Sequence, residues 1–207
     1  ARTSKLSAPV ERHRFPDGEI RLCLPDALPA HAVLLRTLDH PNEKLVELLL
    51  AARTARSLGV RHLTLVAPYL AYMRQDIAFT PGEVVSQRHL GRLLAQVFEL
   101  VITVDPHLHR VSSMDEVVPG RRGVALTASP LLGAWVAAQV PGALLVAPDE
   151  EAEQWVAAAA RGQGLDFLVS TKRRHGDRDV EVDLPEAAVQ SVRPVLATSS
   201  SSTTARP

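Results

Sequence analysis

The sequence predicts an α/β fold in which mostly parallel sheets are covered by helices. Two observations lead to this prediction. Short runs of aliphatic and β-branched residues alternate along the chain with longer amphipathic segments, which is typical of strand–helix–strand units. Most of these runs are apolar at nearly every position, as in strands that are buried on both faces of a parallel sheet. The 207 residues, 46% of them hydrophobic, suffice for one large domain or two small ones.

The strand predictions follow the apolar runs, several of which end at a proline or at an Asp-Pro pair. The expected strands cover residues 19–24, 32–38, 63–67, 100–104, 124–127, 143–147 and 166–169. Cys23, in the first of them, is the only cysteine of the chain. A single cysteine excludes an internal disulfide and fits a reducing compartment. We expect Cys23 to be a small buried side chain.

The helix predictions fill the intervals between these strands. Asn42 is expected to cap a helix that Gly59 ends, because its side chain can accept a hydrogen bond from the first helical turn. Ser129-Pro130 is a second start signal. The expected helices cover residues 43–58, 85–98, 129–139 and about 150–160.

Charge and hydropathy limit the partners of the chain. Lys and Arg together number 23, as do Asp and Glu, so no global field attracts nucleic acid or an acidic membrane. No apolar stretch of the sequence is long enough to span a bilayer, and the N-terminus lacks the apolar region of a signal peptide. We therefore expect a cytoplasmic protein without nucleic-acid or membrane partners.

Polar residues follow the predicted strand 63–67. Residues 68–76 contain two tyrosines and then Arg74, Gln75 and Asp76. In open α/β sheets, the loops beyond the carboxyl ends of the strands bind ligands. A guanidinium, an amide and a carboxylate together suit a phosphorylated or nucleotide ligand. A surface loop with a structural ion pair is the alternative interpretation.

A second polar strand end follows residues 100–104. Asp105, His107 and His109 lie within five residues and could hold a divalent metal. Two loop histidines with this spacing also occur without metal, so both interpretations stay open. Upstream, Asp17-Gly18 is a turn signal just before the first predicted strand.

A basic segment covers residues 171–178 and contains Lys172 and Arg174. One interpretation is a solvated basic loop, and the other is a flap that closes on phosphates. In a flap, these two side chains could stabilise charge that develops during phosphoryl transfer. The chain has neither a GxxxxGK[ST] phosphate loop nor a GxGxxG fingerprint, so a nucleotide must be bound by another device.

Taken in order, these segments resemble the ribose-phosphate pyrophosphokinase family, also called phosphoribosyl pyrophosphate synthetases. The resemblance runs from about Val10 to Leu196. The motifs that carry it are Phe15-x-Asp17-Gly18-Glu19, Asn42 with Glu47-Leu48-Leu49, Pro68-Tyr69-x-x-Tyr72-x-Arg74-Gln75-Asp76, Asp105-x-His107, Pro148-Asp149 and Lys172-x-Arg174. It implies tandem phosphoribosyltransferase-like domains in a homo-oligomer. The implied reaction transfers the diphosphoryl group of ATP to ribose 5-phosphate, which gives phosphoribosyl pyrophosphate and AMP.

The resemblance also implies roles for individual residues. Lys172 and Arg174 would be catalytic, on a flap over the transferring group. Mg²⁺ would be held near the triphosphate by His107 and Asp149, with support from Asp105. The ATP-binding set would comprise Phe15, Asp17, Gly18, Glu19, Arg74, Gln75 and Asp76.

The sequence departs from the family pattern at both ends. Fourteen residues precede Phe15, where the family has a strand and a helix. After Leu196 the family has paired aspartates and a glycine-rich loop that grips ribose 5-phosphate, whereas this chain continues with a Ser/Thr-rich tail. We therefore expect a chain truncated at both ends, with an N-terminal domain over 1–120, an incomplete second domain over 121–196 and a disordered tail over 197–207. A catalytically inactive homologue, which binds nucleotide or associates with full-length synthetase subunits, is the alternative function.

Overall fold

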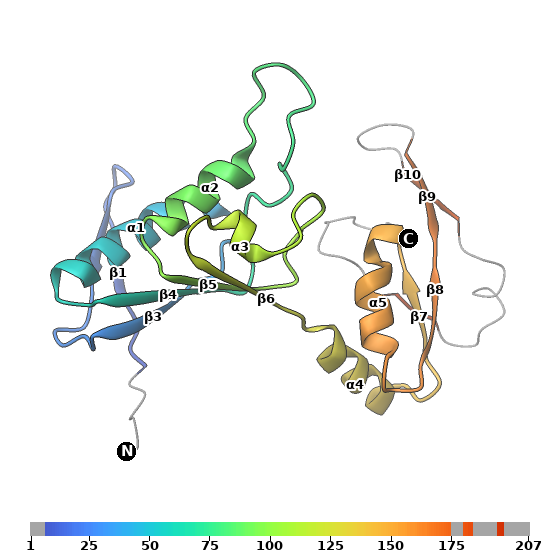
Figure 1. Cartoon of the computed structure of the whole chain (residues 1–207). Helices are drawn as coiled ribbons and strands as arrows, with labels where there is room; N and C mark the ends of the chain where they lie inside the picture. The colour runs from blue at the N-terminus through green and yellow to red at the C-terminus, as the bar shows by residue number, and fades with distance from the viewer. Residues whose placement is uncertain (1–6, 175–179, 184–193, 197–207) are drawn as a thin grey trace. The chain divides into compact units, whose positions relative to one another are not determined.

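The computed structural model in Figure 1 describes residues 7–174, 180–183 and 194–196, and it describes side chains up to residue 170. The chain divides into two compact units, residues 1–126 and 127–207. The division falls after Leu126, whereas the sequence led us to expect a boundary at residue 120. The tail over 197–207 lies outside the described residues.

The first unit contains a four-stranded sheet. Its strands are β3 (His31–Leu35), β4 (His62–Ala67), β5 (Leu100–Val104) and β6 (Arg122–Leu126), in the order β3-β4-β5-β6. All neighbouring strands are parallel. The predicted α/β class is therefore confirmed, and the carboxyl ends of all four strands lie at one edge of the sheet.

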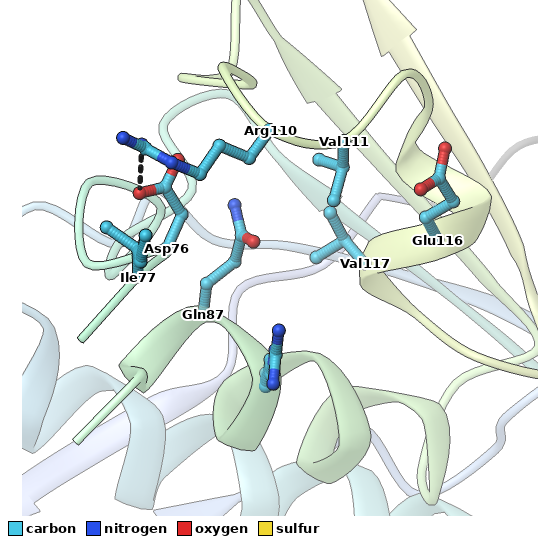
Figure 2. Close-up of a pocket in the computed structure, with 8 residues that line it drawn as sticks. Asp76, Ile77, Gln87, Arg110, Val111, Glu116 and Val117 are labelled. Atoms are coloured by element: carbon cyan, nitrogen blue, oxygen red, sulfur yellow. Dashed lines mark hydrogen bonds and ion pairs between the residues drawn. The ribbon is translucent and has the colours of Figure 1, made fainter. Parts of the chain in front are cut away.

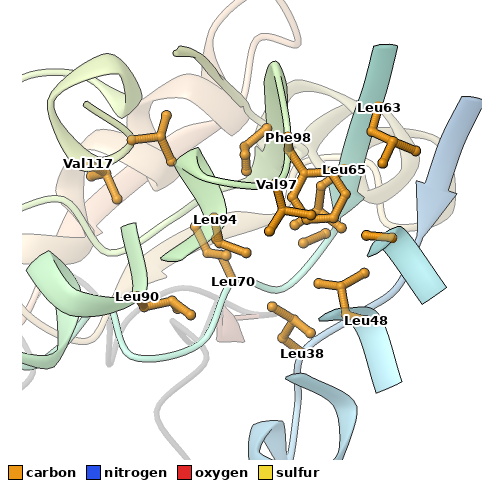
Figure 3. Packing of buried hydrophobic residues seen from close by; sticks show 14 of the residues in the cluster. Leu38, Leu48, Leu63, Leu65, Leu70, Leu90, Leu94, Val97, Phe98 and Val117 are labelled. Atoms are coloured by element: carbon orange, nitrogen blue, oxygen red, sulfur yellow. The ribbon is translucent and has the colours of Figure 1, made fainter. Parts of the chain in front are cut away.

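Helices lie on one side of this sheet (Figure 1): α1 (Pro41–Ser57), α2 (Ser86–Ala95) and the short α3 (Met114–Val117). The core forms between these helices and the sheet, and Figure 3 shows its centre. Leu63 and Leu65 of β4 are fully buried there, as are Leu94 of α2 and the adjacent Phe98. Because side chains alternate between the faces of a strand, every second residue of β4 and β5 enters this core.

The other face of the sheet is open in the part of the chain that the structure describes. Val33 and Leu35 of β3 are 63% and 71% exposed, and Leu126 of β6 is 52% exposed. The intervening side chains on β4 and β5 are only half-buried. The expectation of a sheet covered on both faces is thus wrong for the described residues, because α1, α2 and α3 all pack against the same face.

An antiparallel hairpin precedes the sheet: β1 (Glu11–Arg14) pairs with β2 (Ile20–Cys23). The sequence did not predict β1, whose four residues are all polar and exposed. Cys23 is exposed, so the expectation of a buried thiol is wrong. In β2 the residues Ile20 and Leu22 are half-buried, and the alternate positions, Cys23 among them, face solvent.

The elements of the second unit are α4 (Ser129–Gln139), β7 (Leu144–Ala147), η1 (Glu150–Ala152), α5 (Glu153–Ala160), β8 (Asp166–Val169), β9 (Thr171–Arg174), β10 (Val180–Asp183) and β11 (Pro194–Leu196). The unit has its own three-stranded parallel sheet, in the order β11-β7-β8, and β9 and β10 form an antiparallel pair. Gly133 lets α4 and α5 approach closely, since a Cβ there would lie 1.9 Å from the carbonyl oxygen of Ala159.

The start of α1 differs from the prediction. The helix begins at Pro41, which occupies the first turn, and its N-cap residue is His40, with a positive φ of 48°. Asn42 therefore lies inside the helix and does not cap it. Its Oδ1 instead accepts a hydrogen bond from the Tyr72 hydroxyl.

Among the described helices, none is both long and apolar enough to cross a membrane.

Candidate functional site

The turn between β1 and β2 carries the first group of candidate residues. Backbone hydrogen bonds close it, from Gly18 N to Phe15 O (3.0 Å) and from Phe15 N to Glu19 O (2.8 Å). Gly18 has a φ of 96°, which favours glycine, and Asp17 Oδ1 accepts from Glu19 N at 3.1 Å. The turn predicted at Asp17-Gly18 is confirmed. It presents the Phe15 ring, 40% exposed, at the end of the hairpin.

The loop after β4 carries the second group, and its backbone is anchored to the segment that follows β3 and to the last residue of β5. Leu38 N donates to Tyr69 O (2.9 Å), and Val104 N donates to Pro68 O (3.3 Å). Three of the loop's own side chains, those of Leu70, Ala71 and Met73, are buried. This anchoring holds the loop at the carboxyl edge of the sheet, where Arg74 is exposed and Gln75 is half-buried.

Gln75 is oriented by a neighbouring carboxylate. Its Nε2 donates to Glu83 Oε1 (2.7 Å) and to Ile77 O (3.2 Å). The other oxygen of Glu83 accepts from the backbone N–H groups of Phe79 (2.7 Å) and Thr80 (3.1 Å). These hydrogen bonds, with that of Phe79 the strongest, hold the pKa of Glu83 below its usual value. The Gln75 amide is therefore presented in a defined orientation by an ionised partner.

Asp76 points into a different environment from Gln75. Its side chain is only 4% exposed and forms an ion pair with Arg110, with 2.9 Å between Oδ1 and Nη1. Figure 2 shows this pair at a cavity of about 250 Å³. The second carboxylate oxygen, Oδ2, is buried and accepts no hydrogen bond from the residues described here. Other residues that line the cavity are Ile77, Gln87, Arg88, Val111, Glu116 and Val117.

The Asp76–Arg110 pair links two segments that lie far apart in the sequence. Arg110 follows the segment Asp105–His109 after β5, and Asp76 lies in the connection between β4 and α2. Arg110 was not among the residues predicted from the sequence. Its partner lies 34 residues away along the chain, so the sequence carries no signal for Arg110 beyond its position directly after a polar strand end.

The loop after β5 holds the candidate metal ligands. Asp105 has a positive φ of 42°, and its N–H donates to Leu126 O at 2.8 Å. The rings of His107 and His109 lie with centroids 3.9 Å apart and with 3.2 Å between His107 Nδ1 and His109 Nε2. Across the described residues, no group of three His, Cys, Asp or Glu side chains is arranged to hold a metal.

The side chains of this loop can supply only some of the ligands that Mg²⁺ needs. Mg²⁺ prefers oxygen ligands and is usually held by one or two carboxylates together with water and substrate phosphates. Asp105 supplies the carboxylate in this loop, whereas imidazoles suit transition metals better. The loop therefore fits a metal that arrives with a phosphorylated ligand, rather than a metal caged by protein alone.

The remaining candidates lie in the second unit. Asp149 precedes η1, and its Oδ1 accepts from Ala152 N at 3.0 Å, so this carboxylate caps the 3₁₀ turn. Lys172 and Arg174 lie on β9, opposite Val182 and Val180 of β10. The side chains of both basic residues lie outside the described part of the chain. The flap interpretation of this segment stays a prediction.

Comparison with known proteins gives a family match and several relatives. Residues 2–97 match the model for the N-terminal domain of ribose phosphate pyrophosphokinase. A ribose-phosphate pyrophosphokinase of Methanopyrus kandleri is 32% identical over 193 residues, which is 91% of this chain and 65% of that protein. One of Thermococcus kodakarensis is 33% identical over 84% of this chain and 60% of its own length. One of Saccharolobus solfataricus is 43% identical over 47% of this chain and 35% of its own length.

A solved structure shares the fold. The crystal structure of a phosphoribosylpyrophosphate synthetase from Mycobacterium smegmatis matches 91% of this chain and 61% of its own, with a TM-score of 0.71 and 20% identity. The chain spans less than two thirds of the length of each of the three curated relatives above. The chain is therefore similar in sequence to ribose-phosphate pyrophosphokinases over most of its length, and its residues 2–97 match the N-terminal domain of that family.

Proposed function

We propose that this chain acts as a ribose-phosphate diphosphokinase in nucleotide biosynthesis. It transfers the diphosphoryl group of ATP to ribose 5-phosphate and gives phosphoribosyl pyrophosphate and AMP. The observation that carries the proposal is the joining of two family motifs at one sheet edge. The loop with Arg74 and Gln75 and the loop with Asp105 and His107 are linked by the Asp76–Arg110 pair. Relatives named for this activity support it.

The nucleotide is bound by the loop after β4 and by the hairpin turn, which the resemblance implies often reaches it across a subunit boundary. Phe15, Asp17, Gly18 and Glu19 contact the adenine and ribose, for which the exposed aromatic ring of Phe15 is suited. Arg74 contacts the phosphates, and the carbonyl oxygen of the Gln75 amide accepts from a ribose hydroxyl, because the N–H groups of that amide already donate to Glu83 and Ile77. Asp76 supports these contacts through Arg110, since its carboxylate is buried and already paired.

The transfer is an in-line displacement at the β-phosphorus of ATP. The anomeric hydroxyl oxygen of ribose 5-phosphate forms the new P–O bond, the bond to the α,β-bridging oxygen breaks, and AMP leaves while the hydroxyl proton is released. Lys172 and Arg174 stabilise the negative charge that develops on the transferring group. Because no covalent enzyme intermediate forms, the protein mainly aligns the two substrates.

Asp105, His107 and Asp149 are assigned to Mg²⁺. When bound with ATP, Mg²⁺ neutralises charge on the triphosphate. In this proposal residues 1–120 form an N-terminal phosphoribosyltransferase-like domain with the ATP-site motifs, and residues 121–196 belong to a second domain of that type. The protein works in the cytoplasm as a homo-oligomer.

The test is a measurement of AMP release from ATP. Release should require both ribose 5-phosphate and Mg²⁺, and Lys172→Ala should reduce it by several orders of magnitude because a charge on the transferring group is then left uncompensated. Arg161→Ala, which removes an exposed cation of the same unit, is the control. Full activity of Lys172→Ala would remove Lys172 from the site.

A second function is favoured by one observation on the sequence. Residues 197–207, which follow Leu196 where the family has its sugar-phosphate loop, contain Ser, Thr, Ala, Arg and Pro but no aspartate or glycine. The alternative is a catalytically inactive homologue that binds nucleotide or associates with full-length subunits. ATP binding without any turnover would select this alternative, and AMP release that depends on ribose 5-phosphate would exclude it.

A further inference from the structure

The Gln75 side chain can offer a ligand only one of its two polar atoms. Its Nε2 carries two N–H donors, and both are engaged within the loop. They donate to Glu83 Oε1 at 2.7 Å and to the backbone carbonyl oxygen of Ile77 at 3.2 Å. The carbonyl oxygen, Oε1, is the remaining polar atom of the amide. What Gln75 can present to a ligand is therefore an acceptor.

Glu83 determines which way this amide faces. If the Gln75 amide were rotated by half a turn, its oxygen would lie against Glu83 Oε1, and two acceptors without a proton between them repel each other. The reversed orientation is thus unfavourable as long as Glu83 is ionised. The hydrogen bond from the Phe79 N–H, followed by that from Thr80, holds the pKa of Glu83 below its usual value, so the carboxylate is ionised in the neutral range.

The Glu83 carboxylate is itself fixed, although the residue is exposed. Its second oxygen, Oε2, accepts from the backbone N–H groups of Phe79 at 2.7 Å and Thr80 at 3.1 Å. The Glu83 backbone N–H donates to Thr80 O at 3.2 Å. Gly82, the third residue of this turn, has a φ of 86°, which favours glycine there. Residues 80–83 thus form a closed turn that presents Oε1 to Gln75.

The backbone that carries Gln75 is held from the first turn of α2. Gln87, which is buried there, donates with its backbone N–H to Gln75 O at 3.2 Å and with its Nε2 to Met73 O at 3.3 Å. One residue therefore holds the carbonyl groups on both sides of Arg74. With the main chain held by Gln87 and the amide oriented by Glu83, the Gln75 acceptor is defined before a ligand binds, which reduces the cost of binding.

We infer that Glu83 is a positioning residue that gives the site its preference for a ribose hydroxyl: by engaging the Gln75 nitrogen, it requires the ligand to supply the donor. This inference rests on the proposed function, because that function places ATP beside Gln75. Glu83 touches no substrate. A sugar hydroxyl can donate to Gln75, whereas a fluorine in its place cannot, and a site whose acceptor is left unpaired discriminates against such an analogue.

The test compares ATP with its 2′-deoxy-2′-fluoro and 3′-deoxy-3′-fluoro analogues. Their dissociation constants are measured by calorimetry with Mg²⁺ and without ribose 5-phosphate, so that no transfer occurs. Fluorine is close to a hydroxyl in size but cannot donate a hydrogen bond. One of the two analogues should bind to the wild-type chain on the order of tenfold more weakly than ATP, because Gln75 Oε1 is left unpaired.

Glu83→Gln should reduce this selectivity. The single acceptor oxygen of the introduced amide keeps the backbone N–H groups of Phe79 and Thr80, so its nitrogen faces Gln75. The Gln75 amide then turns round to accept from that nitrogen and presents its own N–H groups to the ligand. These can donate to a hydroxyl oxygen or, more weakly, to fluorine. The difference between ATP and the analogue should therefore fall to about threefold or less.

A second measurement follows the amide itself, without any ligand. In NMR spectra of the wild-type chain, one proton of the Gln75 side-chain amide should be shifted downfield by its hydrogen bond to the ionised carboxylate. Glu83→Gln should remove this shift. Asp26→Asn is the matched control, because it removes an exposed carboxylate elsewhere in the same unit, and it should change neither the signal nor the selectivity.

Gln75→Ala keeps the test decisive if Glu83→Gln is poorly folded. This variant lacks the amide and should lose the selectivity by itself. If Gln75→Ala retains the wild-type selectivity, the inference is overturned, whatever the state of Glu83→Gln. Where both variants fold, adding Glu83→Gln to Gln75→Ala should change the selectivity no further. A further loss would show that Glu83 acts on the ligand by another route, which also overturns the inference.

The outcomes separate the inference from the proposed function. If ATP binds and Glu83→Gln keeps the wild-type selectivity, the inference fails while the proposed function is retained. If neither analogue binds more weakly than ATP to the wild-type chain, Gln75 selects no hydroxyl, and again only the inference fails. If the wild-type chain does not bind ATP, both fail, and the NMR signal of Gln75 then reports a structural hydrogen bond alone.

Discussion

The two partners of the Asp76–Arg110 ion pair differ in exposure, and this difference determines how each contributes. The Asp76 side chain is 4% exposed and that of Arg110 is 50% exposed. Arg110 can therefore turn to water if its partner is lost, whereas Asp76 cannot. A buried carboxylate without a partner carries the full cost of its desolvation. The neighbours Gln75 and Asp76 consequently have different roles, since Gln75 is half-buried near the surface and Asp76 supports the loop from beneath.

This asymmetry predicts unequal effects of two substitutions. Arg110→Ala should lower the free energy of unfolding of the first unit by about 2–3 kcal/mol, because it leaves a buried charge unpaired. Asp76→Asn should lower it by only about 1 kcal/mol. The measurement is urea unfolding at pH 7, followed through the amide NMR signals of residues 7–126. Arg88→Ala, which removes another cation from the same cavity lining, should have little effect. Equal losses for Arg110→Ala and Asp76→Asn would contradict the assignment.

At the scale of elements, local patterns predicted most strands and helices. The apolar runs that became β4, β5 and β7 are recognisable because buried parallel strands are apolar throughout. Elements stabilised by distant partners were not recognisable. The strand β1 is entirely polar, and its partner on α1 is known only once the chain is folded. The helix α1 begins at Pro41, with His40 as its N-cap residue, and not after a cap at Asn42 as expected. The Asn42 side chain instead accepts a hydrogen bond from the Tyr72 hydroxyl.

The junction of α1, β4 and β5 depends on one ion pair of this distant kind. Arg56, in the last turn of α1, lies 2.6 Å from both carboxylate oxygens of Glu99, which also accepts from Leu63 N at 2.7 Å. Burial alone would raise the pKa of Glu99, but the hydrogen bonds from Arg56 and Leu63 outweigh it, so that the pKa is lowered. The ionised form is thus more favourable in the folded chain than in the unfolded one.

A lowered pKa in the folded state gives a defined pH dependence. The contribution of Glu99 to stability should be fully present above its unfolded pKa, about 4.3, and should be lost as the pH falls through its lower folded value. At pH 7, Glu99→Gln should cost about 1–2 kcal/mol, since the side chain is still one third exposed. The measurement is the hydrogen-exchange protection factor of the Leu63 amide in both chains at pH 7 and near pH 3. A difference between the chains that grows towards acid would refute the pairing.

At the scale of the whole molecule, each unit carries its own parallel sheet and its own core. The alternation of strands and helices indicated this architecture, since each βαβ unit is a local pattern of sequence. The pattern could not indicate which sheet faces stay uncovered, because an apolar strand residue looks the same in sequence on either face. The open side of the first sheet is a property of packing. It leaves several large apolar side chains in contact with solvent, which is unusual for a parallel sheet.

The open face of the first sheet predicts the effect of substitutions at Val33 and Leu35, two exposed apolar residues of β3. Val33→Thr with Leu35→Thr should reduce binding of a hydrophobic dye and self-association in sedimentation, because both side chains are more than half exposed and threonine retains the preference for strands. The melting temperature of the first unit should stay within a few degrees of wild type. Leu65→Thr, at a fully buried position on the opposite face, is the matched control and should cost about 2–5 kcal/mol. If the double variant is destabilised as strongly as Leu65→Thr, these two side chains are buried in the protein in solution, and the face is covered there by a partner or by another part of the polypeptide.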